Sequence, residues 1–258
     1  MSYVDLQPAL ENWRYDSDRI SVRKILGQGN EVKIQVRVEL GVLQMEVDGR
    51  PDAEKPFGNA SLLEYHRTQL ADHLRRNATP LGFALTPSQC EALRYEASLY
   101  YRRFVALFVL DEFNEAARDV SHHTGILDLC RDYALEREDR ERLEVFRPYV
   151  LMMNARARAE QASADSDVAC ALAHINRGML HIRTYLEENG PPEAVEQCEE
   201  LTLLEDIRQG LVADLPVDSV VTTHRALRSA IEHERYEEAA RLRDRLNAHY
   251  ETARSTTQ

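Results

Sequence analysis

The sequence predicts a mainly α-helical fold, in which helical hairpins follow a small β element near the N-terminus. The first observation is a change of hydrophobic period near residue 58, from two residues before this point to about 3.6 residues after it. The second is composition, because only ten glycines and nine prolines occur in 258 residues, which favours long helices. We expect an N-terminal α+β region over 1–80, a helical-hairpin domain over 86–210 and a C-terminal hairpin over 222–252.

The β element is predicted near residues 31–48, EVKIQVRVELGVLQMEVD, where apolar and polar side chains alternate. Alternation with β-branched residues is typical of a strand with one buried face. Gly41 is a bend, a bulge or the turn of a hairpin, and the sequence leaves these alternatives open. The flanking segments GQGN (27–30) and DGRPD (48–52) are typical turn sequences. Because a strand and not a helix N-terminus follows GQG, we interpret this segment as a turn and not as a phosphate-binding loop.

Helical periodicity begins at Ser61, which forms a capping-box pattern with Glu64 at the start of SLLEYHRTQLADHLRR. The segment NATPLGFALTP (77–87) then interrupts the pattern with two prolines and a glycine. A second helix is expected to begin with Thr86 as N-cap and Pro87 as its first residue. From there to the C-terminus the pattern is helical, with breaks expected near 121–125, 162–167, 189–192 and 210–222.

Three segments of this helical region share a pattern that is typical of helix–turn–helix hairpins: LDEFNEAARD (110–119), ADSDVACALA (164–173) and HERYEEAARL (233–242). In each, a short polar turn is followed by an apolar anchor and then by alanine, which lets two helices approach closely. The first two resemble tetratricopeptide (TPR) hairpins, most clearly YYRRFVALFVLDEFNEAARD. The tryptophan, the glycine and the terminal proline of that repeat are missing, so we predict TPR-like hairpins and not a regular repeat array.

Charge and hydropathy narrow the classes of partner. The net charge of -12 argues against direct binding to nucleic-acid phosphates. The most apolar stretch, FVALFVL (104–110), is far shorter than a membrane span, and the N-terminus lacks the pattern of a signal peptide. We therefore expect a cytoplasmic protein that makes no membrane contact. The cysteines have no zinc-type spacing, and we predict that they are buried as small apolar side chains: Cys90, Cys130, Cys170 and Cys198.

The segment DEFNEAARDVSHH carries the most suggestive candidate site, since four of its side chains share one helix face: Glu112, Glu115, Asp119 and His122. Carboxylates and a histidine at such spacing resemble the ligands of di-metal helical bundles, but a second Glu-x-x-His helix is missing from the chain. We interpret the face as charged and solvated. No HExxH, GxSxG or Walker motif occurs either, so we expect no enzyme activity, no catalytic or metal-binding residue and no cofactor. Trp13 is expected to dock the N-terminal segment onto the body of the protein.

The tail LRSAIEHERYEEAARLRDRL (227–246) predicts two short helices joined by the turn HERY. Residues 226–250 contain five arginines and five acidic residues, so the hairpin is neutral in an acidic chain. Two short helices bury too little apolar surface to be stable alone. Such a hairpin must pack against something, and a matching hairpin on a partner is the natural candidate.

This tail, and YEEAARLRD above all, resembles the UVR motif, the C-terminal helical hairpin of the excision-repair protein UvrB that also occurs in UvrC and in Clp-protease regulators. The resemblance implies that the hairpin binds another UVR-type hairpin or a complementary one, and that it performs no chemistry. It implies these partner-binding residues: Leu227, Ala230, Ile231, Tyr236, Ala239, Ala240, Leu242, Arg243, Asp244 and Leu246. Helicase and nuclease motifs are absent, as are the zinc-binding cysteine pairs of the activator McsA. The rest of the chain is similar to bacterial proteins that place a VRVELGVLQMEVDGRPD-like segment ahead of a UVR hairpin.

These observations lead to a primary hypothesis: a bacterial, non-catalytic adaptor that docks through its C-terminal UVR hairpin onto a protein partner or onto a second copy of itself. The alternative is an accessory factor of nucleotide-excision DNA repair that is recruited to UvrB or UvrC. A weaker third hypothesis is a metal-dependent enzyme that uses the face at residues 112–123.

Overall fold

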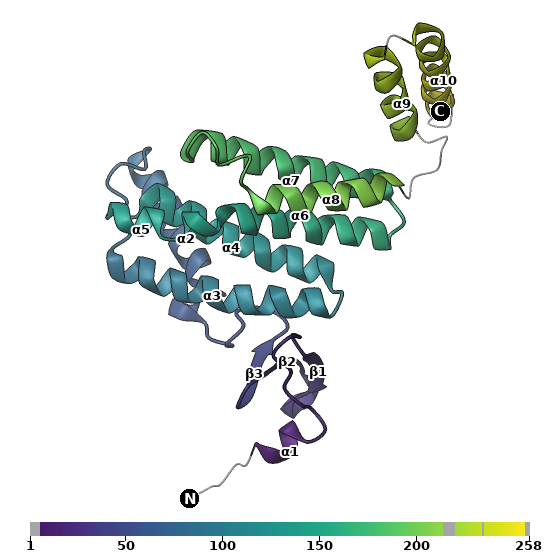
Figure 1. Ribbon diagram of the computed structural model, residues 1–258. Coiled ribbons are helices and arrows are strands. Elements are labelled where there is room, and N and C mark those ends of the chain that lie inside the picture. The colour runs from purple at the N-terminus through teal and green to yellow at the C-terminus, as the bar shows by residue number, and fades with distance from the viewer. Residues whose placement is uncertain (1–5, 214–219, 234, 256–258) are drawn as a thin grey trace, which may run out of the picture. The chain divides into compact units, whose positions relative to one another are not determined.

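The computed structural model describes residues 6–213, 220–233 and 235–255. It confirms a mainly helical chain with a small antiparallel sheet near the N-terminus and a helical hairpin near the C-terminus (Figure 1). The chain divides into two compact units, residues 1–158 and 159–258. The expected division into parts at 1–80 and 86–210 stays a prediction.

The sheet has three strands in the order β1-β2-β3, and each neighbouring pair is antiparallel. Strands β2 (Val32–Val38) and β3 (Gly41–Glu46) lie within the predicted range, whereas β1 (Val22–Leu26) lies before it and was not predicted. Gly41 belongs to a hairpin, because it pairs with Val38 across a two-residue turn. The GQGN segment is also a turn, a short 3-10 helix (η1, Gln28–Asn30) between β1 and β2.

The side chain of Arg37 holds the β2–β3 turn together. Neither turn residue, Glu39 nor Leu40, has a positive φ, although the two-residue turns that suit a hairpin require one. Arg37 compensates by donating from Nη1 to the carbonyl oxygens of Val38 and Gly41, the latter at 2.9 Å. One guanidinium thus satisfies carbonyl groups on both sides of the turn.

Trp13 fastens the N-terminal segment, which includes α1 (Gln7–Leu10), to the sheet, as predicted. Its indole Nε1 donates to Ser21 Oγ at 2.6 Å, and its carbonyl oxygen accepts from Arg37 Nε at 2.9 Å. The guanidinium of Arg23 lies 4.0 Å from the centre of the ring, in cation–π contact. The segment is therefore held by both its backbone and its side chain.

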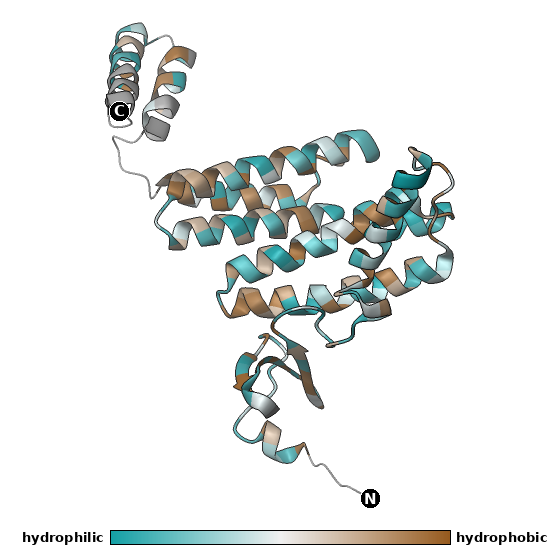
Figure 2. Cartoon of the chain, turned by 180° about the vertical axis from the view of Figure 1, so that it is seen from behind, coloured by the Kyte–Doolittle hydropathy of each residue, from teal (hydrophilic) through white to brown (hydrophobic). Residues whose placement is uncertain are grey.

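The other face of the sheet forms a hydrophobic core with two long helices, α3 (Pro87–Val109) and α4 (Phe113–Tyr133). Ile34 and Met45 of the sheet are buried in one cluster with these helix residues: Ala106, Leu107, Ala116 and Ala117. Figure 2 shows hydrophobic residues on the strands and on the end of α3 beside them. The alternation in the sequence thus correctly indicated a sheet with one buried face.

The remaining elements of this unit are η2 (Pro56–Gly58), α2 (Leu62–Asn77), α5 (Arg137–Glu141), η3 (Glu144–Phe146) and α6 (Arg147–Ala164), which runs into the second unit. Both predicted N-caps are confirmed. Ser61 Oγ accepts from Glu64 N at 3.1 Å, and Thr86 forms a complete capping box with Gln89 at the start of α3. Helices α2 and α3 therefore begin where their cap residues predict.

The break predicted near 121–125 is wrong, because α4 runs through it without interruption. Gly125 lies inside this helix, and a Cβ atom there would come within 3.0 Å of Leu63 Cδ2 and closer still to the Arg67 guanidinium. The glycine therefore allows α2 to approach α4 and does not end the helix. The chain turns earlier instead, between α3 and α4, where Asp111 adopts a φ of 57°.

The second unit contains α7 (Val168–Asn189), α8 (Glu199–Ala213), α9 (Val220–Glu232) and α10 (Tyr236–Ser255). The break before α7 is confirmed, and Asp167 caps this helix by accepting from Cys170 N at 2.9 Å. The break near 189–192 is confirmed as well, since α7 ends at Asn189, whereas the part of the predicted break near 210–222 that separates α8 from α9, residues 214–219, lies outside the described residues. All three predicted hairpin turns fall between helices, with residue 234 of HERY outside the described residues. The likeness to TPR hairpins stays a prediction.

Within the described residues, no helix combines the length and the apolar character that crossing a bilayer would require. The cysteines are free thiols, and Cys90, Cys130 and Cys198 are buried as predicted. The prediction is wrong for Cys170, which is partly exposed in the first turn of α7.

Candidate functional site

The C-terminal hairpin consists of α9 and α10, which pack against each other. Among the side chains of the hairpin that the structure describes, the buried ones are small or apolar: Thr223, Ala230, Ala239 and Leu246. The backbone N–H of Arg235 donates to the carbonyl oxygen of Ala230 at 2.8 Å and thereby closes the turn. At the other end, Arg245 Nη2 donates to the hydroxyl of the buried Thr223 at 3.2 Å. The hairpin is therefore fixed at both ends by hydrogen bonds between its two helices.

The ten residues that the sequence predicts for partner binding fall into three groups. Three are buried inside the hairpin and hold its helices together: Ala230, Ala239 and Leu246. Two are half-buried: Leu227 and Leu242. Five are exposed: Ile231, Tyr236, Ala240, Arg243 and Asp244. The exposed group is the part of the predicted set that a partner can reach without opening the hairpin.

Within the exposed group, three apolar side chains form what we call the turn-end patch: Ile231, Tyr236 and Ala240. Ile231 lies in the last turn of α9 and is 54% exposed, and Tyr236 is the first residue of α10 and is 69% exposed. A shallow hollow of about 580 Å³ adjoins Tyr236 and is lined also by Arg235, Glu237, Glu238 and Arg241. A large exposed aromatic side chain beside a hollow is a typical feature of a protein-binding surface.

Some of the charged side chains around the turn-end patch form ion pairs, and others do not. Arg235 pairs with Glu238 at 2.9 Å, and Arg243 pairs with Asp244 at 2.9 Å. Glu237 and Arg241, in contrast, are exposed and form no ion pair with any residue in the described ranges. Glu237 and Arg241 were not among the predicted partner-binding residues. The sequence could have indicated them, because they lie one helical turn apart on α10. They are the charges that remain for contact with a partner.

The sequence predicts a solvated face for the second candidate site, on α4, but the structure shows that part of this face is buried. Asp119 is fully buried and forms a bidentate ion pair with Arg103 of α3, with distances of 2.5 and 2.8 Å. Arg103 also donates from Nη1 to the carbonyl oxygen of Glu46 at 3.0 Å and so ties β3 to this pair. The interpretation of Asp119 as a solvated residue is therefore wrong, because α3 supplies a buried counter-charge that helical spacing on α4 alone does not reveal.

His122 lies on the same interior side of α4, mostly buried. Its Nε2 is 3.0 Å from Glu96 Oε1, and its ring stacks on Tyr100 with 3.7 Å between the ring centres. The other two residues of the predicted face are less enclosed: Glu112 pairs with Lys24 of β1, and Glu115 is half-buried. The four side chains thus contact different parts of the fold and do not converge on one point.

Glu96 is the centre of a structural network. Its carboxylate accepts the backbone N–H groups of Leu62 and Leu63 at 2.7 and 3.0 Å, which caps α2 from a neighbouring helix. Burial raises the pKa of Glu96, but the bonds from His122 and from these N–H groups outweigh it, so its pKa lies below the ordinary value. Burial raises the pKa of the neighbouring Tyr100 to about 12. Across the described ranges, no three His, Cys, Asp or Glu side chains are arranged to hold a metal ion.

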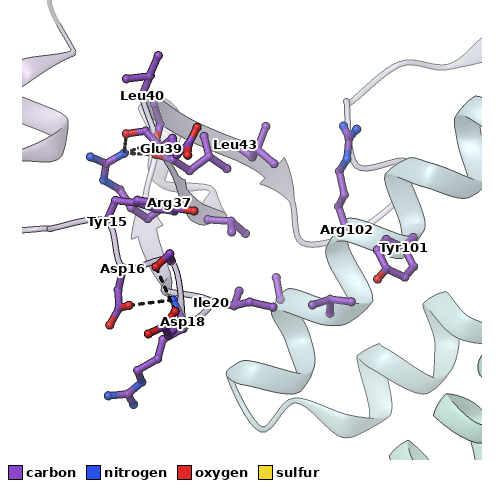
Figure 3. Close-up of a pocket in the computed structure, with 17 residues that line it drawn as sticks. Tyr15, Asp16, Asp18, Ile20, Arg37, Glu39, Leu40, Leu43, Tyr101 and Arg102 are labelled. Carbon is purple, nitrogen blue, oxygen red and sulfur yellow. Dashed lines mark hydrogen bonds between the residues drawn. The ribbon is translucent and has the colours of Figure 1, made fainter. Parts of the chain in front are cut away.

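A hollow of about 710 Å³ lies between the β2–β3 turn and α3, and no sequence pattern predicted it. Figure 3 shows Ile20 and Leu43 on one side of it and Tyr101 and Arg102, both from α3, on the other. Ile20, in the segment just before β1, remains 53% exposed there. The hollow offers an apolar surface, and no member of the predicted binding set lines it.

The comparisons with known proteins concern the C-terminal hairpin alone. A family model described as the UvrB/uvrC motif (UVR) matches residues 224–251, which span most of α9 and α10. The chain therefore carries a UVR motif, as its tail predicted, within the predicted range 222–252. No curated protein and no solved structure matches the chain.

Proposed function

We propose that this protein is a non-catalytic adaptor that binds a protein partner through the turn-end patch of its UVR hairpin. The observation that carries the proposal is the position of Ile231 and Tyr236, which are exposed at one end of a hairpin that matches the UVR motif. The partner carries a UVR-type hairpin or a complementary one, and a second copy of this chain is one such partner.

The energetics of the hairpin support this proposal. Of the hairpin side chains that the structure describes, the buried ones are mainly small (Thr223, Ala230 and Ala239) and contribute little free energy by packing. An additional surface that covers Ile231 and Tyr236 would therefore stabilise both the hairpin and the complex. Full burial of one such large side chain contributes roughly 1.5–3 kcal/mol. Covering Ile231 and Tyr236 thus contributes to the free energy of binding, and other contacts of the hairpin have to supply the rest, because association itself costs translational and rotational freedom.

The contacts of α4 with α3 support the proposal that the protein is not catalytic. The acidic and histidine side chains that most resembled a reactive site are engaged in the fold, Asp119 with Arg103 and His122 with Glu96. We propose accordingly that the protein uses no catalytic residue, metal ion or cofactor. We further propose that it acts in the bacterial cytoplasm, where its four free thiols would remain reduced.

The experiment that tests the proposal uses the full-length chain and its Ile231→Ser/Tyr236→Ala variant. Self-association is measured by sedimentation velocity, and binding to purified proteins with UVR hairpins by isothermal titration calorimetry. We expect the wild type to self-associate or to bind one of these proteins, and the variant to lose that interaction. If the wild type does neither, or if the variant binds equally well, the proposed function is wrong.

A second candidate function is that of an accessory factor in nucleotide-excision repair, recruited to UvrB or UvrC. The observation that favours it is the match to a motif that is named after these two proteins. The net charge of -12 weighs against direct contact with DNA, so recruitment would have to proceed through the hairpin. Binding to purified UvrB or UvrC together with salt-sensitive retention on duplex DNA would favour this function, whereas binding to neither protein would exclude it.

A further inference from the structure

The hollow between the β2–β3 turn and α3 is surrounded by large apolar side chains that solvent reaches (Figure 3). Four of its lining residues belong to this group: Tyr15, Ile20, Leu40 and Tyr101. They come from three separate segments of the chain, which are the stretch before β1, the β2–β3 turn and α3. Single exposed apolar residues are ordinary on a protein surface, whereas exposed apolar side chains that gather in one place mark an interaction site.

The floor of the hollow continues the buried face of the sheet. Ile34 and Met45 lie opposite each other on β2 and β3 and are buried in the core. Side chains two residues apart on a strand point to the same face, so the next pair towards the turn, Val36 and Leu43, shares this face. Both line the hollow, and both are only half-buried. An apolar partner that fills the hollow would therefore extend the hydrophobic core of this unit.

Leu40 stands at the tip of the β2–β3 turn and is 91% exposed. Two-residue hairpin turns favour glycine, asparagine and aspartate, because these residues readily adopt positive φ angles. Leucine offers no such advantage, and Leu40 does not have a positive φ. With so little of its surface covered, the side chain also adds almost nothing to packing within the described residues. Contact with a partner is the use that remains for it.

The charged side chains on the rim of the hollow differ in sign between its two sides. Three exposed carboxylates lie on the side of the sheet: Asp16, Asp18 and Glu39. Arg102 of α3 is exposed on the opposite side (Figure 3), and Arg19 is the one basic residue among 15–20. None of these five side chains forms an ion pair with another residue that the structure describes. A partner that matches both sides carries a basic group towards the carboxylates and an acidic group towards Arg102.

The exposure of the lining favours a protein segment over a small molecule as the occupant. A site for a small molecule encloses most of the surface of its ligand. Here Leu40 and Tyr15 stand at the rim and are 91% and 42% exposed, so an occupant has to cover them from outside as well as fill the space above Val36 and Leu43. A segment of a protein can do both, because its apolar side chains enter the hollow while the chain that carries them lies across the rim.

We propose that this hollow binds a segment of a partner protein in which large apolar side chains are flanked by a lysine or arginine. The apolar side chains pack on Val36 and Leu43 and are covered at the rim by Leu40, and the basic side chain pairs with the carboxylates of Asp18 and Glu39. This second surface lies on the first unit and acts independently of the UVR hairpin. With both surfaces, one chain can hold two proteins at the same time, as an adaptor requires.

The test selects short random peptides, displayed on phage, on the immobilised full-length protein and measures the affinity of the synthetic peptides by fluorescence anisotropy. We expect the selected peptides to combine large apolar residues with a lysine or arginine. The Ile20→Ser/Leu40→Ser variant should bind them roughly tenfold or more weakly, because it removes apolar surface that the peptides cover. Its matched control is Leu26→Ser, since Leu26 of β1 is 69% exposed but does not line the hollow. All three side chains are exposed, so both variants should keep their fold, which circular dichroism checks.

A charge exchange tests the basic part of the partner segment. The Asp18→Lys/Glu39→Lys variant should bind the selected peptides more weakly, and peptides in which glutamate replaces the basic residue should regain affinity for this variant. Glu91→Lys, which reverses an exposed charge of α3 outside the hollow, is the control and should leave the affinity unchanged. The Ile231→Ser/Tyr236→Ala variant should bind the peptides as the wild type does, so this test and the test of the hairpin can fail separately.

Other outcomes would overturn the proposal. These are a selection that enriches no peptide, equal affinity of the Ile20→Ser/Leu40→Ser variant and the wild type, and a charge exchange that fails to restore binding. Loss of peptide binding in the Ile231→Ser/Tyr236→Ala variant would place the peptides on the hairpin and refute the hollow as their site. If the Ile20→Ser/Leu40→Ser variant loses self-association in sedimentation velocity, the hollow binds a second copy of the chain and the proposed occupant is wrong.

Discussion

Ala239 is buried inside the C-terminal hairpin, whereas Ala240, the next residue of α10, is exposed to solvent. Successive residues of a helix point about 100° apart, so only one alanine of this pair can face the neighbouring helix. The two alanines therefore have different tasks: Ala239 allows α9 and α10 to approach each other, and Ala240 keeps the surface beside Tyr236 low. The same substitution at the two positions therefore separates hairpin packing from partner binding.

Replacing Ala239 with leucine should destabilise the hairpin. Extra methylene groups in a tight helix–helix contact cost roughly 1–3 kcal/mol, and Ala239 is buried where α9 and α10 pack against each other. Hydrogen exchange measured by mass spectrometry should show faster exchange in 220–255 and unchanged exchange in 87–133. Equal protection of α9 and α10 in Ala239→Leu and in the wild type would show that this alanine does not set their separation.

Replacing Asp119 with alanine should strongly destabilise the first unit, because Arg103 would keep a buried charge without its partner. The expected loss is about 3–5 kcal/mol in the free energy of unfolding, as measured by urea titration. Glu115→Ala, one turn earlier on α4, is the matched control and should cost far less, since Glu115 is only half-buried. A loss below about 1 kcal/mol for Asp119→Ala, within the range of an exposed ion pair, would contradict the buried pair.

His123 should make the protein sensitive to acid. Burial, assisted by the neighbouring His122, lowers the pKa of His123 from 6.5 to about 4, so the folded chain keeps this ring neutral where the unfolded chain takes up a proton. Stability is complete above the unfolded value and falls as the pH decreases from 6.5 towards about 4. At about 1.4 kcal/mol per pKa unit, the total loss is about 3 kcal/mol.

The His123→Leu variant should remove this part of the pH dependence, which urea titrations across that pH range would measure. The control is His181→Leu, which changes an exposed histidine of α7 and should leave the pH dependence as it is. If the His123→Leu protein loses stability with acid as steeply as the wild type, the ring is not the group that titrates.

Much of the fold follows from local patterns in the sequence. The change of hydrophobic period located β2, β3 and the first long helix, and the cap residues Ser61 and Thr86 marked helix starts that the structure confirms. Strand β1 was not predicted, because VRKIL is too short for its alternation to be distinguished from other patterns. This strand is defined by its pairing with β2. The break expected near 121–125 was wrong because Gly125 serves the contact with α2, which no local signal reports.

The candidate site was predictable to a different extent. The motif identified the hairpin and its turn, but a list of matching residues does not say which of Ala239 and Ala240 faces inward. On α4, the spacing correctly grouped Asp119 with His122 but could not show whether their face is solvated. Their partners Arg103 and Glu96 come from α3, so the answer depends on the packing of two helices and not on the pattern of one.

The proposed adaptor function requires that the exposed face of the UVR hairpin binds a protein partner. The decisive measurement is the affinity of the full-length chain for its UVR-hairpin partner, or for itself, in the wild type, in Tyr236→Ala and in Ala240→Leu. Tyr95→Ala is the matched control, because Tyr95 is a tyrosine of α3 that is 56% exposed. We expect both hairpin variants to lose about tenfold or more in affinity, equivalent to about 1.4 kcal/mol, while the control and the thermal midpoint of the first unit stay unchanged. Unchanged affinity in both hairpin variants would contradict this function.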